Sequence, residues 1–183
     1  MAFLTPNRIK GLLIALAVML ADQLVKWWVL AVLELRQVGV IDLVSFFDLR
    51  YAENRGISYG FLTADSLESR ILLFLLTGVI ALGVLIWMMR ENKLGDIAAL
   101  ALVLGGALGN IIDRVRFTYV VDYADFHLGA WRPFAVFNLA DAAITAGVVL
   151  LLARSLFIRD KPSGDGAGDA HAEIQADTAT EKQ

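Results

Sequence analysis

Carboxylates, carboxamides and basic side chains lie within or at the edges of the long apolar runs of this 183-residue chain. Polar residues in such positions are energetically costly in a membrane, so each one is a candidate functional residue. They form four groups along the sequence: Asp22 with Lys26; Asn54-Arg55-Gly56; Asn110, Asp113 and Arg114 followed by Asp122; and Asn138 with Asp141. The chemistry open to them is that of acids, amides, Lys and Arg.

Composition excludes several other kinds of site. The chain has no cysteine, which rules out disulfides, thiolate metal sites and a cysteine nucleophile. Its two histidines are His127 and His171, too few for a multi-histidine metal site. We therefore expect no metal and no cofactor. Basic patches interleaved with aromatic residues are also missing from the sequence, so we expect no nucleic-acid partner.

The first group is read most simply as structural. Asp22 and Lys26 are four residues apart on one helix face, with the acid first, which favours an ion pair. Trp27 and Trp28 follow, as in the aromatic belt of a membrane interface. We interpret the pair as a salt bridge that lets the helix carry two charges.

For the second and third groups, the local sequence leaves more than one role open. Asn54-Arg55-Gly56 suits a turn, in which Arg55 contacts lipid headgroups or a substrate carbonyl, or is simply exposed. In the third group, Asn110 and Asp113 are three residues apart and project to one side of a helix. Small residues precede them at a spacing of four, which predicts close helix packing: Ala101, Gly105 and Gly109.

The fourth group has two readings of equal weight. Asn138 is a good N-cap residue, and Asp141 three positions later suits a capping box and the helix dipole. The alternative is catalysis. A separate motif, Gly56-Ile57-Ser58-Tyr59-Gly60, matches the nucleophile elbow, but it lacks the strand-to-helix context and the partners that this pattern requires.

Four apolar segments are long enough to cross a bilayer. They run over Gly11–Leu33, Ile71–Met89, Leu94–Ile112 and Leu139–Ile158. A cleaved signal peptide is a weaker reading of the first, because its apolar character continues past Lys26. Basic residues in the short flanks predict cytoplasmic termini by the positive-inside rule. The fold class expected is thus membrane all-α.

Two further segments complete the predicted organisation. Residues 37–51 mix β-branched and aromatic residues with charges, which predicts short strands in an extracytoplasmic β element over about 34–66. Residues 160–183 are rich in Gly, Ala, Asp, Glu and Thr, so we expect a disordered cytoplasmic tail. Residues 1–159 would form one transmembrane domain.

The four groups, in this order on four spans, resemble lipoprotein signal peptidase. The resemblance covers about residues 10–158. It implies four transmembrane helices with a small β-sheet cradle, and an aspartic peptidase whose catalytic aspartates correspond to Asp122 and Asp141. The positions implied to support the site or the substrate are Asn54, Arg55, Gly56, Asn110, Asp113, Arg114 and Asn138.

The same resemblance implies a substrate and a location. The substrate would be a diacylglyceryl-modified prolipoprotein, cut before its lipidated cysteine, with the acyl chains lying among membrane phospholipids. The enzyme would be a multi-pass protein of the bacterial inner membrane, active near the outer leaflet. Two close carboxylates that share one proton suit such a hydrolysis.

Three other functions compete with this one. Intramembrane acids also mark proton-coupled transporters, although here they cluster at the outer ends of the spans. A presenilin-like protease would need a G-x-G-D sequence, which the segment Gly105–Asn110 does not supply. A purely structural bundle would leave the acids without purpose.

Overall fold

The structure is a computed structural model that describes residues 4–56 and 67–157. The predicted tail and Ser58 lie outside these ranges. Four helices in the described part are long and apolar enough to cross a membrane, as the sequence predicted. They are α1 (Pro6–Ala31), α3 (Leu67–Arg90), α4 (Leu94–Phe117) and α5 (Leu139–Phe157).

Helix α4 runs further than its hydropathy indicated. The apolar run ends near Ile112, but the helix continues to Phe117 and stops at Thr118, whose φ is +69°. The extra turns begin at Asp113, which is fully buried. Asp113 is therefore held by partners inside the protein, and hydropathy alone could not predict this extension.

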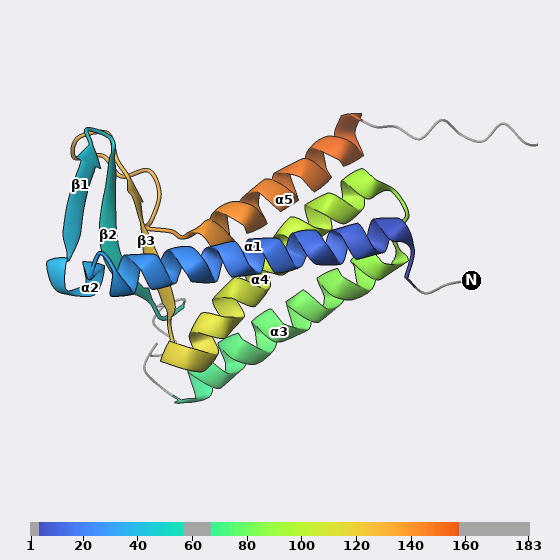
Figure 1. The fold of residues 1–183 in the computed structure, drawn as a ribbon, viewed down its shortest axis with the longest axis horizontal. Helices are drawn as coiled ribbons and strands as arrows, with labels where there is room; N and C mark the ends of the chain where they lie inside the picture. Colours follow the sequence, from blue (N-terminus) through green and yellow to red (C-terminus); the bar gives the residue numbers. More distant parts are fainter. Residues whose placement is uncertain (1–3, 57–66, 158–183) are drawn as a thin grey trace, which may run out of the picture.

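Helix α4 lies at the centre of the bundle, where it packs against α1, α3 and α5 (Figure 1). The predicted small-residue face makes the contact with α1. A Cβ added to Gly105 would lie 2.6 Å from the carbonyl oxygen of Ala15, and one on Gly109 would lie 2.6 Å from Asp22 Oδ2. The two helices can approach this closely only because these positions have no side chain.

A three-stranded antiparallel sheet closes one end of the bundle, whereas the start of α1 and the end of α5 lie at the opposite end (Figure 1). Its order is β1 (Val40–Val44), β2 (Phe47–Asn54) and β3 (Val120–Phe126), and the short helix α2 (Leu35–Val38) precedes it. The strands predicted within residues 37–51 are confirmed. The third strand was not predicted, and it carries Asp122.

A small apolar core fixes the sheet to the helices. It joins Val29 at the end of α1 to Leu35, Leu49 and Tyr123, all of them buried. Burial of side chains of this size contributes roughly 1.5–3 kcal/mol each. Apolar packing thus helps to set the position of β3 relative to α1.

Candidate active site

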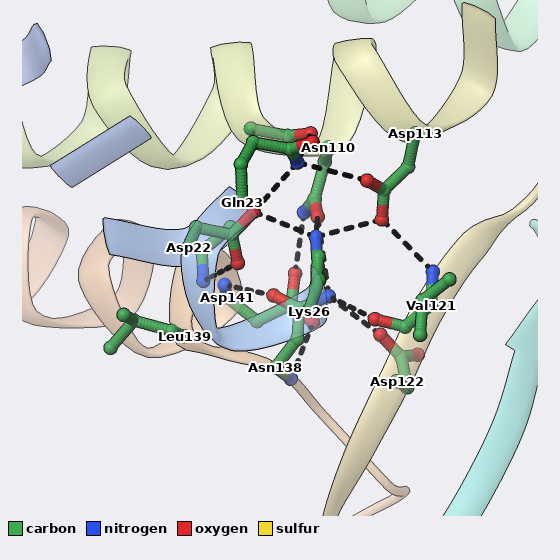
Figure 2. A network of polar contacts seen from close by, with 12 residues as sticks. Asp22, Gln23, Lys26, Asn110, Asp113, Val121, Asp122, Asn138, Leu139 and Asp141 are labelled. Carbon is green, nitrogen blue, oxygen red and sulfur yellow. Dashed lines mark hydrogen bonds and ion pairs between the residues drawn. The ribbon is translucent and has the colours of Figure 1, made fainter. Parts of the chain in front are cut away.

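Asp122 on β3 and Asp141 in the first turn of α5 meet around Asn138 (Figure 2). The Asn138 carboxamide donates from Nδ2 to Asp122 Oδ1 at 2.6 Å, while its backbone N–H donates to Asp141 Oδ2 at 3.3 Å. Asn138 and Asp122 are nearly inaccessible to solvent. One residue therefore holds two carboxyl groups from different elements.

Capping of α5 is complete and is made entirely by side chains. Asn138 Oδ1 accepts from the Asp141 N–H at 2.9 Å, which with the reverse contact forms a capping box. Asp22 Oδ1 accepts from the Ala140 N–H, and the Tyr123 hydroxyl accepts from the Leu139 N–H. The capping geometry is present, and it places Asp141 beside Asp122, so capping and a role in catalysis do not exclude each other.

Asp122 has an unusual environment for an acid. Burial raises its pKa to about 6, and the nearby Asp141 carboxylate pushes it in the same direction. Hydrogen bonds from Asn54 and Asn138 and the charge of Lys26 act against this rise. An acid with a pKa in this range can hold a proton or release it near neutral pH, as general acid–base chemistry requires.

The pKa of Asp125, three residues further along β3, shifts in the opposite direction. It is also fully buried, but its Oδ2 accepts from Arg50 Nε at 2.7 Å and Arg132 Nε at 3.0 Å. Although burial acts to raise its pKa, these two partners hold the pKa below the usual range of aspartate. Burial alone therefore does not distinguish the two acids; their partners do.

Behind the two carboxyl groups lies a buried ion network. Lys26 Nζ is 2.8 Å from Asp22 Oδ2 and 2.8 Å from Asp113 Oδ2, and it donates to Asn110 Oδ1 at 3.2 Å. Asn110 in turn donates from Nδ2 to Asp141 Oδ1 at 2.8 Å. The Asp22–Lys26 pair expected from the sequence is thus present, as part of a larger network (Figure 2).

Sequence reasoning missed several of the network's members. Gln23 donates to Asp113 Oδ1 at 2.9 Å and to the Gly109 carbonyl, and the backbone N–H of Val121 donates to Asp113 Oδ2. The position of Gln23 beside Asp22 was the only signal for it. Nothing local in the sequence indicated that Tyr123 would cap α5, because that contact depends on β3.

Three of the predicted supporting residues surround a cleft of about 290 Å³ next to the carboxyl groups. Asn54 and Arg114 line it and also interact with the site: Asn54 hydrogen-bonds to Asp122, and Arg114 attracts Asp141 and Asp122 electrostatically. Arg55 lines it too and pairs with Glu53 at 2.8 Å.

Gly56 completes the turn that begins at Asn54. Its backbone N–H donates to Asn54 Oδ1 at 3.0 Å, and its φ is +94°, a conformation that favours glycine. The turn expected for this segment is therefore formed, and it orients the Asn54 side chain at the edge of the site.

Asp48 and His127 lie away from these carboxyl groups. His127 Nε2 is 2.9 Å from Asp48 Oδ2, beyond the end of β3 that is remote from Asp122. Within residues 4–56 and 67–157, no group of three or more His, Cys, Asp and Glu side chains is arranged to hold a metal. The site is built from acids and amides, with the ammonium group of Lys26, the guanidinium group of Arg114 and the hydroxyl of Tyr123.

Comparisons with known proteins identify the family of this chain. A family model described as signal peptidase (SPase) II matches residues 14–157. A lipoprotein signal peptidase from Sphingopyxis alaskensis is 50% identical over 91% of this chain and 94% of its own length. Another, from Rhizorhabdus wittichii, is 50% identical over 84% of this chain and 90% of its own length.

Solved structures show the same fold. One, described as a bacterial membrane enzyme structure by the in meso method at 1.9 Å resolution, has a TM-score of 0.69 and 28% identity. The match covers 81% of this chain and 93% of that one. The transporter alternative finds no support in these matches. The chain belongs to the signal peptidase II family, whose members are aspartic peptidases of bacterial membranes.

Proposed function

We propose that this chain cleaves diacylglyceryl-modified prolipoproteins before the lipidated cysteine, with Asp122 and Asp141 as its catalytic residues. The observation that carries the proposal is the shared Asn138, which donates to both carboxyl groups from two different nitrogens. Two carboxyl groups held together in a buried site titrate as a pair and share one proton.

The surroundings of the two acids suggest different roles. Both oxygens of Asp141 accept N–H groups, from Asn110 and from the Asn138 backbone, and Asp141 also lies at a helix N-terminus. Because its oxygens act only as acceptors in these contacts, we assign Asp141 the removal of a proton from the attacking water. Asp122, with its raised pKa, would hold the shared proton and polarise the scissile carbonyl.

The cleft beside the acids suits a lipidated peptide. Its lining combines Asn54, Arg55 and Arg114 with apolar side chains of α3 and α4: Ile71, Leu73, Phe74 and Val115. The polar part would bind the peptide near Asp122, and the apolar part would accept the acyl chains. Binding energy from those chains would then position the scissile bond for attack.

A position at the outer leaflet fits the charge distribution. Basic residues flank the bundle at the end away from the sheet: Arg8, Lys10, Arg90 and Lys93. The positive-inside rule puts that end in the cytoplasm. At the other end, exposed Phe46, Trp131 and Phe134 suit the interface with phospholipid headgroups. We therefore propose that the sheet is extracytoplasmic and that residues 4–157 act as one domain.

A cleavage assay on the purified full chain tests the assignment of Asp122 and Asp141. We expect the wild type to cut a lipidated prolipoprotein but not its unlipidated form, and Asp122→Asn and Asp141→Asn each to abolish cleavage. Asp125→Asn is the matched control, since it alters a buried acid on the same strand and should retain activity. Cleavage by Asp141→Asn at the wild-type rate would overturn the proposal.

The orientation can be tested separately, because the chain contains no cysteine. Single cysteines would be placed at Ser45, in the turn between β1 and β2, and at Asn92, in the loop between α3 and α4. In intact spheroplasts, an impermeant maleimide should label the first and not the second. The reverse pattern would place the sheet in the cytoplasm.

A further inference from the structure

Lys26 makes one contact, with Asn110, that a structural ion pair does not require. Its ammonium group carries three N–H bonds, and three oxygens surround it: Asp22 Oδ2, Asp113 Oδ2 and Asn110 Oδ1. The side chain is only 3% exposed, so no solvent competes for these bonds. One of the three donors is thus committed to an uncharged amide that is buried near the sheet end of the bundle.

That contact decides which way the Asn110 carboxamide points. A carboxamide has a donor end and an acceptor end of nearly the same shape, whereas an ammonium group can only donate. Lys26 therefore requires the oxygen of Asn110 on its own side. Asn138 Nδ2 donates to the same oxygen at 3.2 Å, which reinforces this choice.

The orientation of Asn110 fixes what Asp141 receives. With the oxygen facing Lys26, Nδ2 must face Asp141, and it donates to Oδ1 at 2.8 Å. A flipped amide would set its oxygen against the carboxylate and leave the ammonium without its third acceptor. Lys26 thus acts on Asp141 through a single intervening side chain (Figure 2).

The other partners of Lys26 do not need this arrangement. Asp113 already accepts from Gln23 and from the backbone N–H of Val121, and Asp22 accepts from the backbone N–H of Ala140. These bonds join α1, α4, β3 and α5 without any contribution from Asn110. The contact between Lys26 and Asn110 therefore has its main consequence at Asp141.

We propose that Lys26 is a positioning residue for the catalytic pair, which it acts on by holding the Asn110 carboxamide with its N–H₂ group toward Asp141. This inference rests on the proposed function of Asp122 and Asp141. The positive charge of Lys26 also lowers the pKa of Asp122, so its loss should be visible in the pH dependence of the reaction.

The experiment measures kcat, KM and the pH profile of kcat/KM for the full chain acting on a lipidated prolipoprotein. For Lys26→Met we expect kcat to fall by about 10- to 100-fold, as for a misplaced catalytic group, with KM nearly unchanged. The alkaline limb of the profile should move to higher pH, because Asp122 then loses its proton less readily. Lys26→Arg, which can only donate, should recover part of the loss in kcat.

Arg154→Gln provides the matched control. It removes an interhelical ion pair at the opposite end of the bundle, where Arg154 Nε lies 2.6 Å from Asp96 Oδ1. Its melting temperature should fall, with kcat and the pH profile unchanged. If Lys26→Met behaved in the same way, with lower stability but wild-type kinetics, Lys26 would be structural only and the inference would be overturned.

A second variant keeps the test decisive if Lys26→Met does not fold. Lys26→Gln loses the charge but can still donate to Asp22 or Asp113. Its carboxamide can present either its donor or its acceptor end to Asn110, so it no longer dictates how Asn110 points, and kcat should fall as in Lys26→Met. Wild-type kinetics for Lys26→Gln would overturn the inference. Loss of activity in Asp122→Asn and Asp141→Asn would still support the catalytic pair, so the two proposals can fail independently.

Discussion

Both ends of the helix bundle contain ion pairs, but the paired side chains differ in how deeply they are buried. At the sheet end, the Asp22, Lys26 and Asp113 side chains are at most 3% exposed, and each has several partners. At the other end, Asp96 and Arg154 form one short ion pair with side chains 22% and 28% exposed. The ion pair at this second end can exchange its partners for water, whereas Asp22, Lys26 and Asp113 depend on partners within the protein.

This difference indicates where polar groups serve function. Burying charge is unfavourable unless every bond is replaced, and an apolar core of the same shape is often at least as stable. The sheet end keeps its buried charges nonetheless, next to the two acids that we assign to catalysis. The partly exposed pair at the other end links two neighbouring helices, α4 and α5.

In this comparison of the two ends, the largest loss of activity should follow replacement of Asn138, which links the two acids. Asn138→Leu removes the side-chain donor to Asp122 and the Oδ1 that accepts from the Asp141 N–H, so we expect kcat to fall by about 100-fold or more. Asn92→Ala is its counterpart at the other end, where Asn92 accepts hydrogen bonds from Asn7 and Arg8. Cleavage kinetics should separate the two variants, and an equal loss in both would remove the distinction between the ends.

Asp122 should also lower the stability of the folded chain near neutral pH. Its pKa of about 6 in the folded chain exceeds the 3.8 of an unperturbed aspartate. The bound proton therefore stabilises the fold fully below about pH 4, and this contribution is lost as the pH rises through about 6. Asp122→Asn avoids that loss, which corresponds to at most roughly 3 kcal/mol.

Melting temperatures would check this prediction. Asp122→Asn should melt higher than the wild type at pH 7.5, and the difference should shrink at pH 4. Asp96→Asn, at the other end, should melt lower than the wild type at pH 7.5, because the variant loses the charge that pairs with Arg154. Identical pH dependence of the two variants would contradict the prediction.

Close packing near the acids should tolerate little added volume. A Cβ on Gly106 would meet the carbonyl oxygen of Ala140 and Ile144 Cγ1, and Ala140 immediately precedes Asp141. We expect Gly106→Ala to cost about 1–3 kcal/mol in the free energy of unfolding. Gly83→Ala is the control, since a Cβ there meets nothing within 4 Å, and it should be neutral or slightly stabilising. Denaturation in mild detergent would compare the two.

The smallest effect should be found at the exposed end. Arg154→Gln breaks the pair with Asp96, and the resulting fall in melting temperature should be slight and should vanish at high salt, because exposed ion pairs are screened. Lys26→Met should instead lower the melting temperature at low and high salt alike. Equal salt dependence in both variants would show that the buried network is solvated.

The sequence predicted those parts of the molecule that depend on local pattern. Hydropathy located the four membrane helices to within a few residues, and the four-residue spacing identified Gly105 and Gly109 as the close contact of α4. The spacing of Asp22 and Lys26 predicted their ion pair. In each case the interaction depends on one helix, or on one face of it.

The parts that were missed depend on contacts between distant segments. Strand β3 has no alternation of apolar and polar residues, because nearly all of it is buried and its acids are held by specific partners. Gln23 and Tyr123 contact the site only after the sheet has packed against the bundle. The equal weight given to capping and catalysis for Asp141 could not be resolved locally, because the capping box itself brings Asp141 to Asp122.

The capping of α5 also has a consequence for the order of assembly. The first N–H groups of this helix are satisfied by Asp22 from α1, by Tyr123 from β3 and by Asn138. Since α5 follows every other described element along the chain, its first turn can be completed only after α1 and β3 are in place. A partly synthesised chain would therefore hold Asp122 without Asp141, and hydrolytic activity would arise only when the fold is finished.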